Sequence, residues 1–197
     1  MIDHAKFFAA LAHAPFRLDI PARQQHAAVL LDAAEKRNPA IDPRWIAYML
    51  ATALWETGFT LAPIAEYGHG RGHAYGVPAG PWHQAYYGRG DVQLTWEGNY
   101  RHATARLRAA GVIGPDINLE RNPDFALRPD IAAAVMVLGM TEGWFTGRKL
   151  ADYFSDRFDD PVHARRIING LDRAETIAGF YREFLHALLC AGPAVAA

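Results

Sequence analysis

A glycine-rich segment divides this chain into two helical parts, and it is the feature that most restricts the possible folds. The segment runs from Phe59 to Gly98 and shows no helical period, whereas the residues on both sides of it do. It holds eight of the 17 glycines, at positions 68, 70, 72, 76, 80, 88, 90 and 98. An irregular stretch of this length in a compact chain is usually disordered or functional. Its many aromatic residues argue against disorder, so we expect an ordered loop that forms part of a site.

Helices are expected on both sides of the loop. The apolar spacing predicts helices over 21–37 and 44–57, and the second begins after Asp42-Pro43, a capping residue followed by proline. Further helices are expected over 96–110, 129–143 and 172–189, the last opened by Asp172 and Glu175 at the spacing of a capping box. The alternation of polar and apolar residues over 91–95 predicts a short strand or hairpin. We therefore expect a mainly α, α+β domain whose loop and hairpin line a central cleft.

The composition excludes several functional classes. The 20 Lys and Arg residues nearly balance the 21 Asp and Glu residues, which gives no electrostatic reason to bind nucleic acid. No apolar run approaches the roughly 20 residues that a membrane span needs. The first 16 residues resemble an amphipathic helix more than a signal peptide, and Cys190 is the only cysteine. We expect a monomer made in the cytoplasm, with neither a nucleic acid nor a membrane as partner.

Glu56 is a candidate for acid catalysis. It lies in the last turn of the helix expected over 44–57, where unpaired carbonyl groups and the helix dipole disfavour an ionised carboxylate. Burial beside Trp55 and Phe59 would act in the same direction. A carboxyl group that retains its proton near neutral pH can protonate a leaving group. The sequence therefore predicts Glu56 as a general acid.

Glu66 is the second candidate, because it and Glu56 are the only acidic residues between positions 42 and 91. Solvent and the nearby Arg71 would keep Glu66 ionised, as a general base requires. Glycosidases divide the acid and base roles between two carboxyl groups in unlike surroundings, and inverting enzymes hold them about 6.5–9.5 Å apart to admit a water. The pattern by itself also fits two ordinary surface glutamates.

Five motifs in order along the chain carry a resemblance to a known family. They are Glu56-Thr57-Gly58 followed by Glu66, then Tyr-Tyr-Gly-Arg-Gly-Asp-Val-Gln-Leu-Thr at 86–95, Asn99-Tyr100, Asn122-Pro123-Asp124 and Ile168-Asn169-Gly170. Over about residues 45–184 the chain resembles the family 19 glycoside hydrolases, the chitinases and phage endolysins of the lysozyme superfamily. It departs from them at Trp55, where relatives usually carry histidine, and it lacks the cysteines of secreted plant relatives.

The resemblance implies an activity and a set of site residues. It implies hydrolysis, with inversion, of a β-1,4 link next to N-acetylglucosamine, without a metal or an organic cofactor. Glu56 matches the general acid of the family, and Glu66 its general base. Positions that contact the sugar or hold the attacking water are matched by Tyr86, Gln93, Thr95, Asn99 and Asn169. Trp82 is expected to stack on a sugar ring, and Arg173 to brace a carboxylate or contact the sugar.

The substrate and two other classes of function stay open at this point. We expect one catalytic domain over residues 1–197, with its core at about 20–190 and no separate binding domain. The lack of a signal peptide and of disulfides favours an endolysin that is released from the cytoplasm and degrades peptidoglycan, with chitinase as the alternative. A glycan-binding protein without catalysis also fits, because Trp55 is an irregular neighbour for the acid. A zinc peptidase using Glu66, His69 and His73 is disfavoured, because the intervening glycines oppose a helix.

Overall fold

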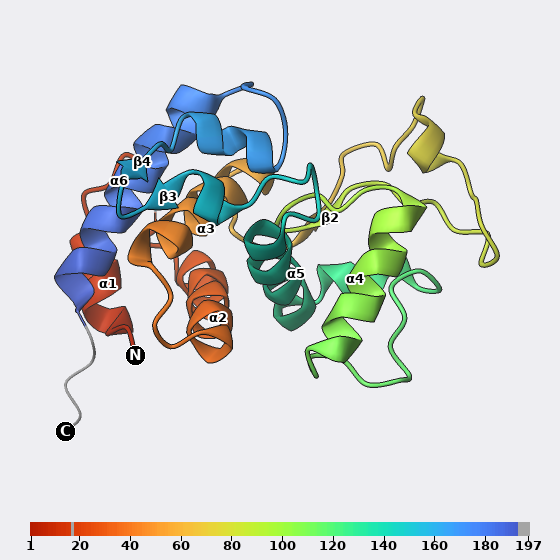
Figure 1. Ribbon diagram of the computed structural model, residues 1–197, viewed down its shortest axis with the longest axis horizontal. Helices are drawn as coiled ribbons and strands as arrows, with labels where there is room; N and C mark the ends of the chain where they lie inside the picture. The colour runs from red at the N-terminus through yellow and green to blue at the C-terminus, as the bar shows by residue number, and fades with distance from the viewer. Residues whose placement is uncertain (17, 193–197) are drawn as a thin grey trace.

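The computed structural model describes residues 1–16 and 18–192, and it is mainly helical (Figure 1). Its helices are α1 His4–Ala10, α2 Pro21–Arg37, α3 Pro43–Glu56, α4 Glu97–Ala109, α5 Pro129–Glu142 and α6 Ala174–Ala191. Short 3₁₀ helices are η1 Ala74–Gly76, η2 Pro123–Leu127, η3 Leu150–Asp152 and η4 His163–Ile167. Among the described helices, none combines the length and apolar character of a bilayer span. The expected mainly α fold is confirmed.

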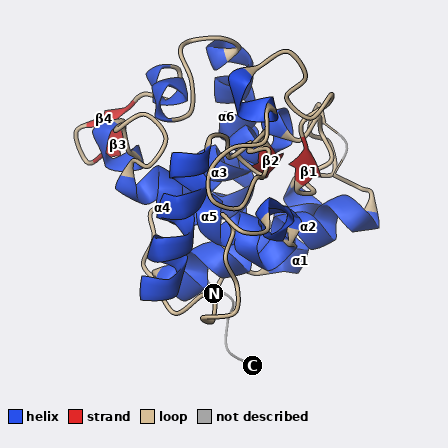
Figure 2. Ribbon diagram, turned by 90° about the vertical axis from the view of Figure 1, so that its right-hand side faces the viewer, coloured by secondary structure: helices blue, strands red, loops and turns tan. Residues whose placement is uncertain are grey.

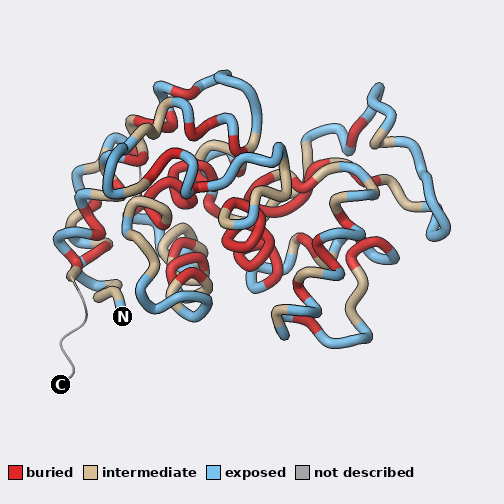
Figure 3. The backbone as a smooth tube through the Cα atoms, viewed as in Figure 1, coloured by how far each residue is buried: buried red, intermediate tan, exposed pale blue. Residues whose placement is uncertain are grey.

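Two helices form the centre of the core. On α3, every residue from Ile46 to Leu54 is buried, and on α5 the same holds from Ile131 to Met140. Helices that are apolar on all sides belong in the interior, so the sequence pattern explains their position. α3 packs along α6, which also contacts α1, and α2 packs against α5. Figure 3 shows the burial concentrated in this part of the molecule.

Local signals in the sequence set the ends of these helices. The Asp42 side chain accepts a hydrogen bond from the Arg44 backbone N–H at 2.9 Å, and Pro43 occupies the first turn of α3. α5 ends at Gly143, which has the left-handed φ of 82° that glycine tolerates best. At α6 the prediction of a capping box is wrong: the N-cap is Arg173, with φ of 58° and no side-chain cap.

Two small antiparallel strand pairs lie apart from each other among the helices (Figure 2). In the first, β1 (Ile64–Ala65) pairs with β2 (Arg89–Gly90), with Ile64 opposite Gly90. The second joins β3 (Phe154–Ser155) to β4 (Phe158–Asp159), a hairpin that the sequence does not predict. The hairpin expected over 91–95 is shifted, because Arg89 pairs with Leu94 and the residues between them form the turn.

The outer part of the glycine-rich segment projects away from the helices and is largely exposed (Figures 1 and 3). Its shape depends on a close approach between two backbone segments. A Cβ atom on Gly76 would lie 2.1 Å from the carbonyl oxygen of Gly70, and one on Gly70 would lie 2.7 Å from the Cα of Gly76. Neither position has room for a side chain. The path of the loop at this point therefore depends on glycine at both positions.

Candidate active site

Glu56 is the last residue of α3, and its carboxylate forms an ion pair with Arg165 of η4. The Nη1 atom of Arg165 lies 2.5 Å from Oε1 of Glu56, and the two side chains are only 3% and 16% exposed. Arg165 also donates from Nε to the carbonyl oxygen of Asp172 at 3.1 Å. No described residue forms a hydrogen bond with the second oxygen of Glu56, Oε2. The carboxyl group is therefore held through one oxygen only.

The sequence does not reveal the role of Arg165. It predicts that Arg173 braces a carboxylate or contacts the sugar. The structure places the guanidinium of Arg173 5.7 Å from the ring centre of Trp55, and the ion pair with Glu56 is made by Arg165. The sequence assigns no role to Arg165 or to its neighbour Arg166.

Glu66 follows β1 directly and is held by two donors. Its Oε1 accepts a hydrogen bond from the Tyr75 hydroxyl at 3.1 Å, and its Oε2 accepts one from the Gly88 backbone N–H at 3.0 Å. The backbone N–H of Glu66 in turn donates to the Gly88 carbonyl at 2.7 Å, so the strand register fixes the position of the side chain. Burial raises the pKa of Tyr75, and so does its hydrogen bond to Glu66, which keeps the phenol a donor. Each oxygen of Glu66 thus accepts one hydrogen bond, and the two contacts fix the orientation of the carboxyl group.

The expected role of Arg71 beside Glu66 is not seen, since no ion pair joins them among the described residues. Glu56 and Glu66 therefore have different surroundings. Glu56 forms an ion pair with an arginine, and Glu66 accepts hydrogen bonds from two neutral donors. The cleft between them, and a gap that would admit a water, stay predictions.

Arg89, in the middle of the longest motif, holds the loop in place. Its side chain is 5% exposed, and its Nε donates to Asp124 Oδ1 at 2.8 Å. Its Nη1 donates to the carbonyl groups of Ala85 and Tyr87 and to the hydroxyl of Tyr100. The guanidinium carbon also lies 3.5 Å from the ring centre of Tyr87. Two separate motifs, at 86–95 and 122–124, thus meet in one ion pair between the buried Arg89 and the exposed Asp124.

Four of the predicted sugar contacts are engaged within the protein. The Tyr86 ring is 2% exposed and its hydroxyl donates to the Glu120 carbonyl, so its burial does not fit a contact with substrate. Gln93 donates from Nε2 to backbone carbonyls of both β1 and β2, which ties the two strands together. Thr95 donates to the Gln93 carbonyl, and Asn99 donates to the Thr95 carbonyl, at 2.7 and 2.8 Å. These residues shape the loop, and only the half-buried Gln93, Thr95 and Asn99 leave polar atoms near the surface.

The other three predicted contacts are exposed. Trp82 is 41% exposed, and the Arg121 guanidinium lies 5.3 Å from its ring centre. Asn169 accepts a hydrogen bond from the Gly170 backbone N–H, within the late Ile-Asn-Gly motif. Arg173 is also exposed, beside Trp55. All three side chains are accessible to a ligand from solvent.

Backbone strain in the described residues gathers around these motifs. Non-glycine residues rarely adopt positive φ, and such strain clusters at functional sites. The described non-glycine residues with positive φ all lie between the end of α3 and the start of α4, or at the start of α6. They are Phe59, Leu61, His69, His83, Gln93, Trp96 and Arg173. The surrounding structure must hold these strained residues in place, and their clustering supports a functional site in this region.

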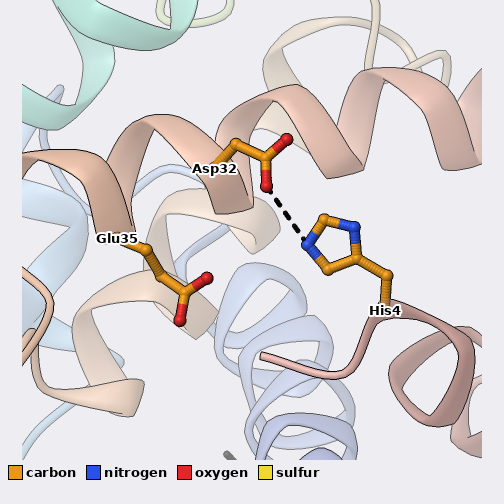
Figure 4. Close-up of side chains that lie close together, drawn as sticks. All are labelled: His4, Asp32 and Glu35. Carbon is orange, nitrogen blue, oxygen red and sulfur yellow. Dashed lines mark ion pairs between the residues drawn. The ribbon is translucent and has the colours of Figure 1, made fainter. Parts of the chain in front are cut away.

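The histidines considered for a zinc site pack against aromatic rings. The His69 ring stacks on Tyr87 with centres 4.7 Å apart, and the His73 ring stacks on Tyr75 at 4.9 Å. A different group of described residues, His4, Asp32 and Glu35, brings its possible ligand atoms within 4.8 Å of one another (Figure 4). His4 there lies 3.3 Å from Asp32, and Glu35 accepts a hydrogen bond from the Ile2 backbone N–H at 2.7 Å. These groups already have protein partners.

Asp91 is the only acidic residue of the motif at 86–95, and its carboxyl group has an oxygen without a partner among the described residues. Its residue is 5% exposed, and its Oδ1 is buried without a hydrogen bond to any described group. Burial raises the pKa of Asp91 to about 7. A raised acid pKa means that the folded state holds the proton more tightly than the unfolded state. Stability is therefore lost as the pH rises from the unfolded pKa of 3.8 to about 7.

Replacing Asp91 with asparagine should stabilise the protein in a pH-dependent way. A pKa difference of about three pH units corresponds to at most about 4 kcal/mol above pH 7, and to little at pH 4, where both states are largely protonated. Urea unfolding of Asp91→Asn at pH 4 and pH 8 measures this directly. Asp156→Asn, at an exposed position, is the control and should change little at either pH. An equal gain at both pH values would refute the buried charge as the cause.

Comparison with known proteins defines the fold. No family model and no curated protein matches the sequence. Among solved structures, chitinase C from Streptomyces griseus superposes with a TM-score of 0.57 at 22% identity, over 95% of this chain and 76% of that one. A class IV family 19 chitinase from Zea mays gives 0.55 at 20% identity, over 97% and 94%. A bacterial family 19 chitinase gives 0.54 at 21% identity, over 95% and 94%. The chain therefore has the fold of the family 19 chitinases.

Proposed function

We propose that this protein is an inverting glycoside hydrolase that cleaves β-1,4 links in a glycan containing N-acetylglucosamine. The observation that carries the proposal is a pair of glutamates with different partners. Glu56 forms an ion pair with Arg165, and Glu66 accepts hydrogen bonds from Tyr75 and Gly88. Glycosidases divide the acid and base roles between two such carboxyl groups. The proteins of similar fold are chitinases, which agrees with this class of reaction.

The contacts support one choice of atom for each proton transfer. Arg165 occupies Oε1 of Glu56, so Oε2 is the oxygen that carries the proton to the glycosidic oxygen as the bond from that oxygen to the anomeric carbon breaks. Glu66 takes a proton from a water that attacks the same carbon from the opposite face. Tyr75 and Gly88 each bind one oxygen of Glu66, which orients its remaining lone pairs toward that water. The products are two shorter glycans, one with an inverted anomeric hydroxyl.

Charge on the glycine-rich segment favours peptidoglycan as the substrate. None of its exposed side chains is acidic, whereas four are arginine or histidine: His69, Arg71, His73 and His83. Its three acidic side chains are buried or half-buried: Glu66, Asp91 and Glu97. Peptidoglycan carries carboxylates on its peptide branches, whereas chitin is neutral, so only the former gains from this surface. We propose an endolysin that acts as a monomer on the cell wall after release from the cytoplasm.

Chitin is the second candidate, because the solved structures of similar fold are chitinases. The two substrates are distinguished by the release of reducing ends from purified bacterial sacculi and from chitin hexamers. We expect faster release from sacculi, because the carboxylates of peptidoglycan are attracted to the basic groups of the glycine-rich segment. Cleavage of chitin alone would reverse the assignment. Binding of both without any new reducing ends would identify a glycan-binding protein.

A further inference from the structure

Trp82 and Arg121 form an exposed pair at the edge of the glycine-rich segment. The Arg121 guanidinium lies 5.3 Å from the ring centre of Trp82, and 41% of Trp82 is exposed. The Arg121 backbone N–H donates to Asn118 Oδ1 at 3.0 Å, whereas its guanidinium has no ion pair or hydrogen bond with a described residue. An exposed aromatic ring with such a cation beside it suits a ligand that has both an apolar face and an anionic group.

The carboxylates on either side of Arg121 in the chain are bound to other arginines. Glu120 Oε1 accepts a hydrogen bond from Arg101 Nε at 3.0 Å, and Asp124 Oδ1 accepts one from Arg89 Nε at 2.8 Å. The guanidinium group carries five N–H donors in a planar fork, a geometry that matches a carboxylate. The local pairing of charges therefore leaves the guanidinium of Arg121 for a carboxylate from outside the protein.

Backbone contacts fix the two side chains relative to each other. Trp82 lies in the turn over 79–84, whose end residues exchange backbone hydrogen bonds of 2.9 and 3.2 Å. Just after this turn, the hydroxyl of the buried Tyr86 donates at 3.0 Å to the carbonyl of Glu120, the residue before Arg121. The segment that carries the ring and the segment that carries the guanidinium are therefore joined in the core below the pair.

A series of side-chain contacts connects the same turn to the proposed base. Glu66 accepts a hydrogen bond from the Tyr75 hydroxyl, and the Tyr75 ring meets that of Trp96 edge to face, with centres 5.3 Å apart. Glu97 follows Trp96 and packs on the turn, because a Cβ atom on Gly80 would lie 2.4 Å from Glu97 Oε1. The turn and the proposed base thus belong to one ordered part of the molecule.

We propose that Trp82 and Arg121 form a binding subsite for a sugar unit that carries a carboxylate. The exposed part of the indole ring stacks on the face of the sugar, and the guanidinium pairs with a carboxylate on the branch of the same unit. A neutral glycan such as chitin supplies the sugar face without the anion. Arg121 is therefore a residue that selects peptidoglycan, with no part in the chemical step. The inference rests on the proposed substrate but does not require hydrolysis.

The test compares native bacterial sacculi with sacculi whose carboxyl groups have been converted to amides. The glycan strands are the same in both, and only the charge differs. Binding is measured by sedimentation in the Glu56→Gln background, so that the glycan is not consumed. We expect Arg121→Gln to weaken binding to native sacculi about fivefold, the upper range for an exposed ion pair, and to change binding to amidated sacculi less than about twofold. Trp82→Leu should weaken binding to both forms equally, because stacking does not depend on the carboxylate.

Arg157→Gln is the matched control. It removes the same charge from an exposed arginine between β3 and β4, far from the projecting loop in Figure 1, and should bind like its parent. Arg121→Lys should give an intermediate affinity, because it keeps the charge but not the planar fork. Equal losses on native and amidated sacculi in Arg121→Gln, or no loss on either, would overturn the proposal, as would a parent that binds both forms alike. If the hydrolase proposal fails, the protein releases no reducing ends, yet charge-dependent binding through Arg121 is still measurable, so the two failures are distinguishable.

Discussion

Glu56→Gln should leave the protein folded and able to bind glycan while lowering hydrolysis about 10²–10⁴-fold, the usual contribution of a general acid. The amide has nearly the shape of the acid and can still accept a hydrogen bond from Arg165 through its oxygen. It cannot deliver a proton to the glycosidic oxygen. Reducing-end release at saturating substrate, together with binding to sacculi in a sedimentation assay, measures both properties in one preparation.

The control for this variant is Glu175→Gln, which changes an exposed glutamate in the first turn of α6. It removes the same charge without touching either candidate carboxyl group, so its turnover should match the parent protein. Full hydrolysis by Glu56→Gln would end the assignment of the acid. Loss of binding as well as turnover would show that Glu56 serves the glycan rather than the chemistry.

Arg165→Met should reduce the free energy of unfolding by about 3–5 kcal/mol, the usual cost of breaking a buried ion pair from one side. The methionine preserves much of the apolar volume, but it leaves the Glu56 carboxylate, 16% exposed, without its partner. It also leaves the Asp172 carbonyl without its donor. We expect hydrolysis to fall together with stability, since the carboxyl group loses the contact that orients it. Urea unfolding and the hydrolysis assay measure the two effects.

A second substitution separates the ion pair from general damage to the core. In Arg165→Met combined with Glu56→Gln, no buried charge remains unpaired, so much of the stability lost in the single variant should return. The adjacent Arg166→Met changes an exposed arginine and should alter the free energy of unfolding by no more than about 0.5 kcal/mol. A double variant as unstable as the sum of its parts would exclude the pair as the main contribution of Arg165.

The parts of the fold that the sequence predicts well are those set by neighbouring residues. α2 spans Pro21–Arg37 as expected, and α3 begins within one residue of the expected position because Asp42 and Pro43 act locally. The resemblance in five motifs likewise leads to the fold that the solved chitinase structures share. Short-range signals of this kind depend on a few residues in a row, so a linear reading captures them.

The sequence alone does not predict contacts between distant segments. Arg165 and Glu56 are 109 positions apart, and nothing in the pattern singles out Arg165 over Arg166. Tyr86 looks like a ligand-binding residue by its motif, yet tertiary packing uses it in the core. The capping box at α6 fails for a related reason: Arg173 adopts a left-handed conformation at the N-cap, and the spacing of Asp172 and Glu175 alone does not determine that geometry.

The close contact between Gly70 and Gly76 sets the backbone path in this part of the projecting loop. Since two main-chain segments define the path, the histidines and aromatic residues around them can change identity without changing that path. Directed evolution toward a different polysaccharide should therefore tolerate wide variation at His73 and Val77. It should return almost no viable clones that carry any residue other than glycine at positions 70 and 76.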